Sequence, residues 1–196
     1  RSGNAPYPMK KILVLFFIFF TATSALALDI KNPNVAGQFY PSDPSELKKM
    51  ISSFIEKAEV KPQDADIRMI IVPHAGYIYS GSTAGFAFKA IKDKDFKTVV
   101  IVGPSHHASF DGISVYESGI FKTPLGGVAI DGELAKKFTA YNKKIFFYPK
   151  AFAKEHSVET EIPFLQIVLR DFKIVPIVFG DQTPGNIEIL GKALTD

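Results

Sequence analysis

The sequence predicts an α/β fold: a mixed, largely parallel sheet flanked by helices. Short apolar runs, typical of strands buried on both faces, alternate along the chain with segments of helical periodicity. Hydrophobic residues make up 46% and charged residues 22% of the 196 residues, which suits a packed core. A chain of this length favours a single domain, which we place at residues 28–196.

The first expected helix begins after Asp43, an N-cap candidate. Pro44 suits the first helical position, and Glu46 lies where a capping-box acid would lie. Apolar side chains then recur at helical spacing as far as Ile55. The polar stretch 61–66 separates this helix from the first expected strand.

Strands and helices alternate in the rest of the chain. Apolar runs predict buried strands at residues 69–72, 98–102, 145–148 and 174–179, and helices are expected at 82–92, after the N-cap candidate Asp131, and at 158–170. A last helix, which carries Ile187 and Leu194, follows the fourth strand. Such a crossover helix normally leads to another parallel strand, and none follows before Asp196. We therefore expect a domain that lacks its C-terminal part.

The first 27 residues have the pattern of a secretory signal peptide. Lys10 and Lys11 precede an unbroken apolar run at 12–20, and a small-residue cleavage pattern ends at Ala27. That run is shorter than the roughly 20 residues that span a bilayer. We expect residues 1–8 to be non-native or upstream residues and 9–27 to be a cleaved signal peptide. The mature protein would then be periplasmic or secreted, with no membrane attachment.

Charge and cysteine content narrow the functions further. The net charge of +3 comes from residues 1–27, which carry three basic side chains and no acidic one. The remaining chain is balanced, so no basic footprint for nucleic acid is present. The absence of cysteine excludes disulfides, thiol catalysis and Cys-ligated zinc within this sequence. A metal site in this chain would use histidines and carboxylates.

The four histidines, His74, His106, His107 and His156, all lie between expected strands and helices. His74 follows the first expected strand, and the adjacent pair follows the second. Because ligands of open α/β sheets bind beyond the carboxyl ends of the strands, two strands would bring histidines to one edge. The positions of the four histidines in the sequence support two interpretations equally: a shared metal site, or histidines with no common role. Imidazole ligands suit iron, copper or zinc.

Five ordered motifs resemble those of the Memo family. They lie at residues 35–41 (VAGQFYP), 73–81 (PHAGYIYSG), 103–107 (GPSHH), 123–126 (TPLG) and 155–159 (EHSVE), the last followed by 163–166 (PFLQ). The resemblance implies a fold similar to the class III extradiol dioxygenases of the LigB type. It also implies that His74 and His106 are metal ligands and that His156 projects into the same cleft. The family's further ligand comes from a C-terminal segment that lies beyond the residues matched here.

The resemblance also suggests roles around these ligands. His107, Glu155 and Glu159 are expected to surround the metal or to position a substrate. Tyr77 and Tyr79 could position an aromatic small molecule, with packing at the strand end as the alternative. Bacterial relatives suggest radical-SAM and AMMECR-type proteins as partners, although an export signal fits poorly with a cytosolic radical enzyme.

Three functions are open at this point. The first is a mononuclear, non-haem metal-dependent oxidoreductase that holds Fe(II) or Cu, with Zn as a further alternative, and uses His156 as general acid and base. The second is a non-catalytic metal-binding or adaptor protein on the same scaffold. The third is a metal-independent Ser–His hydrolase that uses Ser105 or Ser157, each of which adjoins a histidine.

Overall fold

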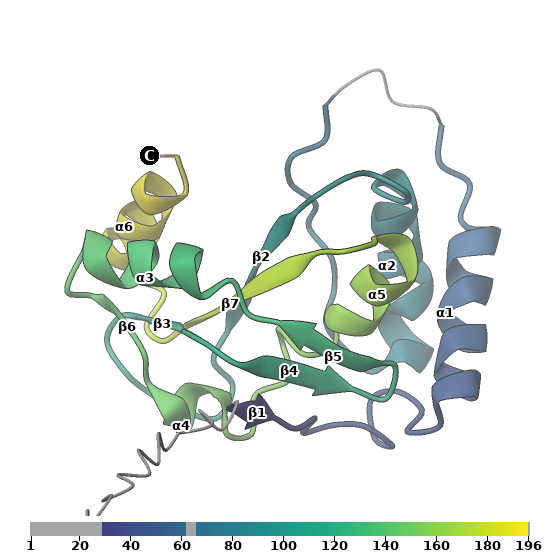
Figure 1. The fold of residues 1–196 in the computed structure, drawn as a ribbon, viewed down its shortest axis with the longest axis horizontal. Helices are drawn as coiled ribbons and strands as arrows, with labels where there is room; N and C mark the ends of the chain where they lie inside the picture. Colours follow the sequence, from purple (N-terminus) through teal and green to yellow (C-terminus); the bar gives the residue numbers. More distant parts are fainter. Residues whose placement is uncertain (1–28, 62–65, 196) are drawn as a thin grey trace, which may run out of the picture.

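The computed structural model describes residues 29–61 and 66–195 and shows an α/β architecture with helices around mixed sheets (Figure 1). The expected signal peptide at 9–27 and residues 1–8 lie outside the described part. The strands are β1 (Ile30–Lys31), β2 (Thr98–Pro104), β3 (Ile113–Val115), β4 (Ile120–Thr123), β5 (Gly126–Ala129), β6 (Ile145–Phe146) and β7 (Lys173–Phe179). The helices are α1 (Pro44–Lys57), α2 (Tyr77–Ala90), α3 (Gly132–Tyr141), α4 (Pro149–Phe152), α5 (Ile162–Val168) and α6 (Pro184–Thr195).

The strands form two mixed sheets. One has the order β1-β4-β5 and the other the order β2-β7-β3-β6. In the larger sheet β2 and β7 run parallel over their full lengths, from Thr98 opposite Lys173 to Pro104 opposite Phe179. β3 pairs antiparallel with β7 and parallel with β6. The predicted fold class, a mixed sheet flanked by helices, is confirmed.

Strand β7 explains why its sequence is an unbroken apolar run. Its side chains alternate between two cores because successive residues of a strand point to opposite faces. Ile174 and Val178 belong to the core shared with α1, α2 and α5, whereas Val175 and Ile177 belong to a smaller core with α3 and α6. Figure 1 shows these two groups of helices on opposite sides of the view, with the sheet between them.

The predicted helix starts at Asp43 and Asp131 are confirmed. The Asp43 carboxylate accepts a hydrogen bond from the backbone N–H of Glu46, and the Asp131 carboxylate accepts one from that of Leu134. Each bond satisfies a donor that the first turn of a helix leaves free. The last predicted helix is confirmed as α6.

The prediction of a strand at residues 69–72 is wrong. The structure has no paired strand between 66 and 76, and Met69 and Ile71 are 79% and 87% exposed. The apolar composition is that of a buried strand, but a strand also needs a hydrogen-bonded neighbour. The other three predicted strands are present as β2, β6 and β7, with β6 shorter than expected.

Other differences concern element boundaries and short elements. Helix α2 begins at Tyr77 rather than at residue 82, and α5 covers only part of the predicted 158–170. Strands β1, β3, β4 and β5 and helix α4 were not predicted.

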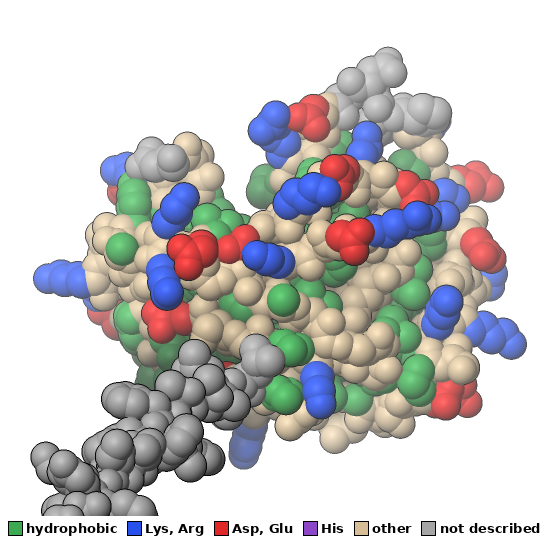
Figure 2. Space-filling model, in the orientation of Figure 1, with side chains coloured by type: hydrophobic (Ala, Val, Ile, Leu, Met, Phe, Trp, Pro, Cys, Tyr) green, Lys and Arg blue, Asp and Glu red, His purple; other side chains and the backbone are tan. Residues whose placement is uncertain are grey.

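On the face in Figure 2, basic and acidic side chains are interspersed, in keeping with the balanced charge. Within the described ranges, no helix has the length and apolarity that a bilayer crossing requires.

Candidate metal centre

Three histidines from distant parts of the chain meet in one cluster. His74, His106 and His156 each offer a ring nitrogen, and these nitrogens all lie within 4.8 Å of one another. The rings of His106 and His156 are stacked, with centroids 4.5 Å apart and planes 15° from parallel. The His74 ring centroid lies 5.3 Å from that of His106 and 6.0 Å from that of His156. A cluster of this kind could hold one metal ion.

His74 and His106 reach the cluster from two loops. His74 precedes α2, whose first residue is anchored by a hydrogen bond from the Tyr77 backbone N–H to the carbonyl of Phe39 (2.7 Å). His106 follows the carboxyl end of β2. The Ser105 backbone N–H, next to it, donates to the carbonyl of Phe179 at the end of β7 (2.7 Å). His106 therefore lies just beyond the carboxyl end of a strand, as expected for ligand-binding residues of such sheets, whereas His74 follows a segment that is not a paired strand.

The segment that carries His156 packs tightly against the end of β2. A Cβ added at Gly103 would lie 2.4 Å from Ser157 Oγ, so only glycine leaves room for this serine. The Ser157 hydroxyl donates a hydrogen bond to the carbonyl of Pro104 (2.9 Å). This contact fixes the position of His156 relative to His106.

The Glu155 carboxylate accepts hydrogen bonds from two of the three histidines and from Ser157. Its Oε1 lies 2.8 Å from His106 Nδ1, and its Oε2 accepts a 2.5 Å hydrogen bond from the His106 backbone N–H. Oε1 also accepts from the backbone N–H groups of His156 and Ser157, both at 2.8 Å. A carboxylate at Nδ1 holds the proton on that nitrogen, so His106 Nε2 is left with a free lone pair.

The electrostatics favour an ionised Glu155 and neutral imidazoles at His74 and His156. Burial would raise the pKa of Glu155, but hydrogen bonds from His106, Ser157 and His156 outweigh it and lower that pKa to about 2. The pKa of His74 is lowered by burial and by the neighbouring His106, against a smaller opposing effect of Glu155. Burial also lowers the pKa of His156, reinforced by the other histidines and opposed by Glu155. Neutral imidazole is the form that binds metal.

The other residues singled out from the sequence lie around the cluster in different ways. The His107 ring centroid is 6.1 Å from that of His156. Tyr79 is 80% exposed, whereas Tyr77 is buried and its hydroxyl donates to the carbonyl of Thr160 (2.6 Å), an arrangement that fits the packing alternative. Glu159 is buried against residues 34–40, here called the N-terminal segment. Its carboxylate accepts hydrogen bonds from the Tyr40 hydroxyl and from the backbone N–H groups of Asn34 and Val35.

The two serines considered for a hydrolase use their hydroxyl groups elsewhere. Ser105 Oγ donates to the carbonyl of Ala108 (2.7 Å) and accepts from its N–H (3.1 Å). Ser157 is 2% exposed and bonded to Pro104. Across the described ranges no hydrogen bond joins either hydroxyl to a histidine ring, so no nucleophile–base pair is in place.

Two contacts from the N-terminal segment were not predicted as part of the site. The Phe39 ring lies against His156, with centroids 4.6 Å apart. The Asn34 side-chain amide donates hydrogen bonds to the carbonyls of Phe152 and Glu155 (3.1 and 2.8 Å). It thereby holds the segment of backbone that precedes His156. The sequence motif at residues 35–41 includes Phe39 but not Asn34, and nothing in it showed which loop the segment contacts.

The three imidazoles could together hold one metal ion. Metal–nitrogen bonds of about 2.0–2.1 Å place two ligands of one ion roughly 3–4 Å apart, within the separation seen here. The donor set is nitrogen-rich, backed by a carboxylate, and partly exposed: the His106 side chain is 37% accessible and that of His156 14%. This arrangement resembles sites that keep an open coordination position.

Comparison with known proteins gives the same family as the sequence motifs. The family model described as Memo-like protein matches residues 31–196. A MEMO1 family protein of Thermoplasma volcanium is 39% identical over 155 residues, which cover 78% of this chain and 56% of that protein. One from Nitrosopumilus maritimus is 37% identical over 170 residues, 84% of this chain and 62% of that protein. The chain thus spans about 60% of the length of these relatives.

Proposed function

The chain belongs to the Memo-like protein family, and on that premise we propose that it binds one redox-active or divalent metal ion at the histidine cluster and serves as a non-haem oxidoreductase. The convergence of His74, His106 and His156 within 4.8 Å carries the proposal. In it, His74 and His106 are ligands, and His156 is the neighbouring acid and base. Fe(II) and Cu suit the ligand set best, with Zn as a third choice.

The contacts of Glu155 support this division of roles. Its carboxylate holds the Nδ1 proton of His106 and so presents Nε2 to the metal. The same carboxylate lies 3.7 Å from His156 Nδ1, beyond hydrogen-bond distance, so His156 is not locked in one tautomer by it. His156 can therefore accept or release a proton at the open side of the cluster. A bound Fe(II) or Cu ion would supply the redox chemistry.

The proposal extends to a small aromatic substrate. The Phe39 ring, which lies against His156, offers an aromatic surface beside the cluster, and the exposed Tyr79 adds a hydroxyl near the start of α2. Radical-SAM and AMMECR-type proteins as partners, and export after cleavage near Ala27, belong to the same proposal and rest on family resemblance and the N-terminal pattern alone.

Oxygen uptake by the Fe(II)-loaded protein with a panel of catechols tests the oxidoreductase proposal. We expect substrate-dependent uptake that falls at least 100-fold in His156→Ala, while metal content changes less than threefold. Metal binding without uptake on any catechol would instead support the non-catalytic, adaptor function. If His156→Ala loses metal as completely as His74→Ala, His156 is a third ligand. Activity that survives exhaustive chelation would favour the Ser–His hydrolase.

A further inference from the structure

The side-chain amide of Asn34 joins two parts of the chain that lie far apart in sequence. It donates hydrogen bonds to the carbonyls of Phe152 and Glu155 (3.1 and 2.8 Å). The Glu155 carbonyl belongs to the peptide bond that leads directly into His156, one of the three clustered histidines. Asn34 thus holds the backbone immediately before a residue of the candidate metal centre.

Glu155 is held both at its backbone and at its side chain. Its carbonyl accepts a hydrogen bond from Asn34, 121 residues away in the sequence. Its carboxylate accepts hydrogen bonds from the backbone N–H groups of His106, His156 and Ser157. Because the direction of this carboxylate depends on the backbone that carries it, Asn34 acts on two histidines through Glu155.

The other end of the N-terminal segment contacts the loop that carries His74. The carbonyl of Phe39 accepts a hydrogen bond from the Tyr77 backbone N–H (2.7 Å), and a Cβ added at Gly76 would lie 3.6 Å from the same oxygen. The Phe39 ring also lies against His156, with centroids 4.6 Å apart. The N-terminal segment therefore touches the loops of two of the three histidines.

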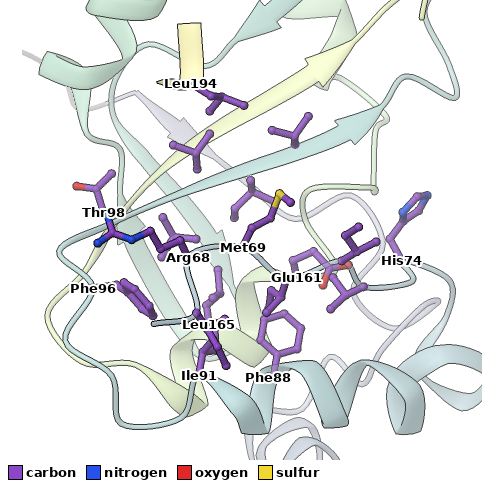
Figure 3. Close-up of a pocket in the computed structure, with 18 of the residues that line it drawn as sticks. Arg68, Met69, His74, Phe88, Ile91, Phe96, Thr98, Glu161, Leu165 and Leu194 are labelled. Atoms are coloured by element: carbon purple, nitrogen blue, oxygen red, sulfur yellow. The ribbon is translucent and has the colours of Figure 1, made fainter. Parts of the chain in front are cut away.

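His74 depends on its loop for its position. In Figure 3 its ring lies at one end of a cavity of about 610 Å³ and points away from Met69 and Phe88. The lining of this cavity is mostly apolar, and apolar side chains cannot orient an imidazole by hydrogen bonds. We therefore expect the anchored start of α2 at Tyr77 to set the direction of the His74 ring.

A compact turn keeps the two ends of the N-terminal segment at a fixed separation. The backbone N–H of Phe39 donates to the carbonyl of Val35 (2.9 Å). The backbone N–H of Gly37 donates to the carbonyl of Tyr40 (2.7 Å). Gly37 has a φ of +80°, a conformation that favours glycine. Because the turn is internally hydrogen-bonded, it can hold both histidine loops in one arrangement.

We propose that Asn34 is a positioning residue of the metal centre and that the N-terminal segment acts as a clamp, which holds the three histidines in place before a metal ion binds. In this role, which rests on the proposed function of metal binding, Asn34 touches no metal. Ligands that are already in place bind more tightly, because ordering the loops no longer costs free energy at the moment of binding. Loss of the Asn34 amide leaves two carbonyls without this donor and frees the backbone of Glu155.

Amide hydrogen exchange in the metal-free chain tests the positioning role. The three backbone N–H groups that donate to the Glu155 carboxylate report on its position. Asn34→Ala should speed the exchange of these amides at least tenfold relative to the amides of β7, which report global unfolding. Asn32→Ala is the matched control, because this asparagine is exposed and lies two positions away, and it should change nothing. Equal exchange in Asn34→Ala and the unmodified chain would overturn the proposal.

Metal titration tests the coupling to the ligands. We expect Asn34→Ala to weaken the Zn²⁺ affinity at least tenfold and to shift the visible absorption of bound Co²⁺, which depends on ligand geometry. Glu159→Gln loosens the N-terminal segment but keeps the Asn34 amide, so it should change the affinity less than threefold. Equal losses in the two variants would show that Asn34 supports only the fold and would overturn the proposal. Should the unmodified chain bind no metal, the proposed function fails, and the exchange measurement still decides the role of Asn34.

Discussion

The carboxylate of Glu155 binds His106 twice, through the backbone N–H at 2.5 Å and the ring Nδ1 at 2.8 Å, although 49 residues separate them. The two bonds fix both the loop that carries the histidine and the orientation of its ring. Nε2 is then the His106 ring nitrogen left with a lone pair for a metal ion. Glu155 is thus a positioning residue for the cluster.

Replacing Glu155 tests that role. Glu155→Gln removes the negative charge and puts an amide where four N–H groups point, three from the backbone and one from the His106 ring, so it should weaken metal affinity by about 10- to 100-fold. Competition titration with a chromophoric chelator and Zn²⁺ or Co²⁺ measures this change. Glu133→Gln, on a side chain that is 91% exposed, serves as the control and should have no effect. Equal affinities of Glu155→Gln and the unmodified chain would show that the cluster does not depend on Glu155.

Replacing the second buried carboxylate, Glu159, should lower the stability of the fold and leave the metal affinity nearly unchanged. It accepts hydrogen bonds from the backbone N–H groups of Asn34 and Val35 and from the Tyr40 hydroxyl (2.7, 3.0 and 2.7 Å). Glu159→Gln should therefore lower the free energy of unfolding by about 1–3 kcal/mol. Its metal affinity should change less than threefold. Urea unfolding and the same chelator titration check both values, and a loss of affinity without a loss of stability would reverse the assignment.

Gly103 should be important for metal binding although it is not a ligand. A methyl group there would overlap Ser157 Oγ and push the segment of His156 away from β2. We expect Gly103→Ala to weaken metal affinity at least tenfold and to destabilise the fold by about 1–3 kcal/mol. Gly191→Ala is the matched control, because nothing lies within 4 Å of a Cβ added there in α6, and it should be neutral or slightly stabilising. Unchanged affinity in Gly103→Ala would show that the Ser157 contact does not set the cluster.

Glu161 should make the stability of the chain depend on pH. Its pKa is about 8 in the folded protein and ordinarily 4.5, so between these values the unfolded chain loses a proton that the folded chain keeps. The free energy of unfolding contributed by this group therefore falls as the pH rises from 4.5 to 8. Glu161→Gln should remove this fall, raising stability by about 2–5 kcal/mol at pH 8 and little at pH 4. Urea unfolding at both pH values measures the difference, and an equal effect at the two would contradict the assignment.

The sequence predicts those features that depend on local pattern. Strand β7 was predicted because its residues are apolar on both faces, and Asp43 because a helix start uses a nearby carboxylate. Residues 69–72 have the same pattern as β7, but pairing depends on a neighbouring strand that local sequence does not specify. Strand β5 is short and begins with two glycines, so its sequence resembles a turn, and β4 is only four residues long.

For the site, the loop positions of His74 and His106 after apolar runs were enough to suggest a shared edge. The approach of His156 and the double contact between Glu155 and His106 were not predictable from spacing. They depend on how the segment after α4 folds back onto the end of β2 through Gly103 and Ser157. Such contacts between distant segments leave no periodic pattern in the sequence.

The metal content of the purified chain after exhaustive dialysis against Fe(II), Cu(II) or Zn²⁺ tests the central claim most directly. We expect one ion per chain in the unmodified protein and in His107→Ala, and less than one tenth of an ion in His74→Ala and His106→Ala. Retention of one ion per chain by His74→Ala or His106→Ala, with both variants folded, would contradict the assignment of the metal centre.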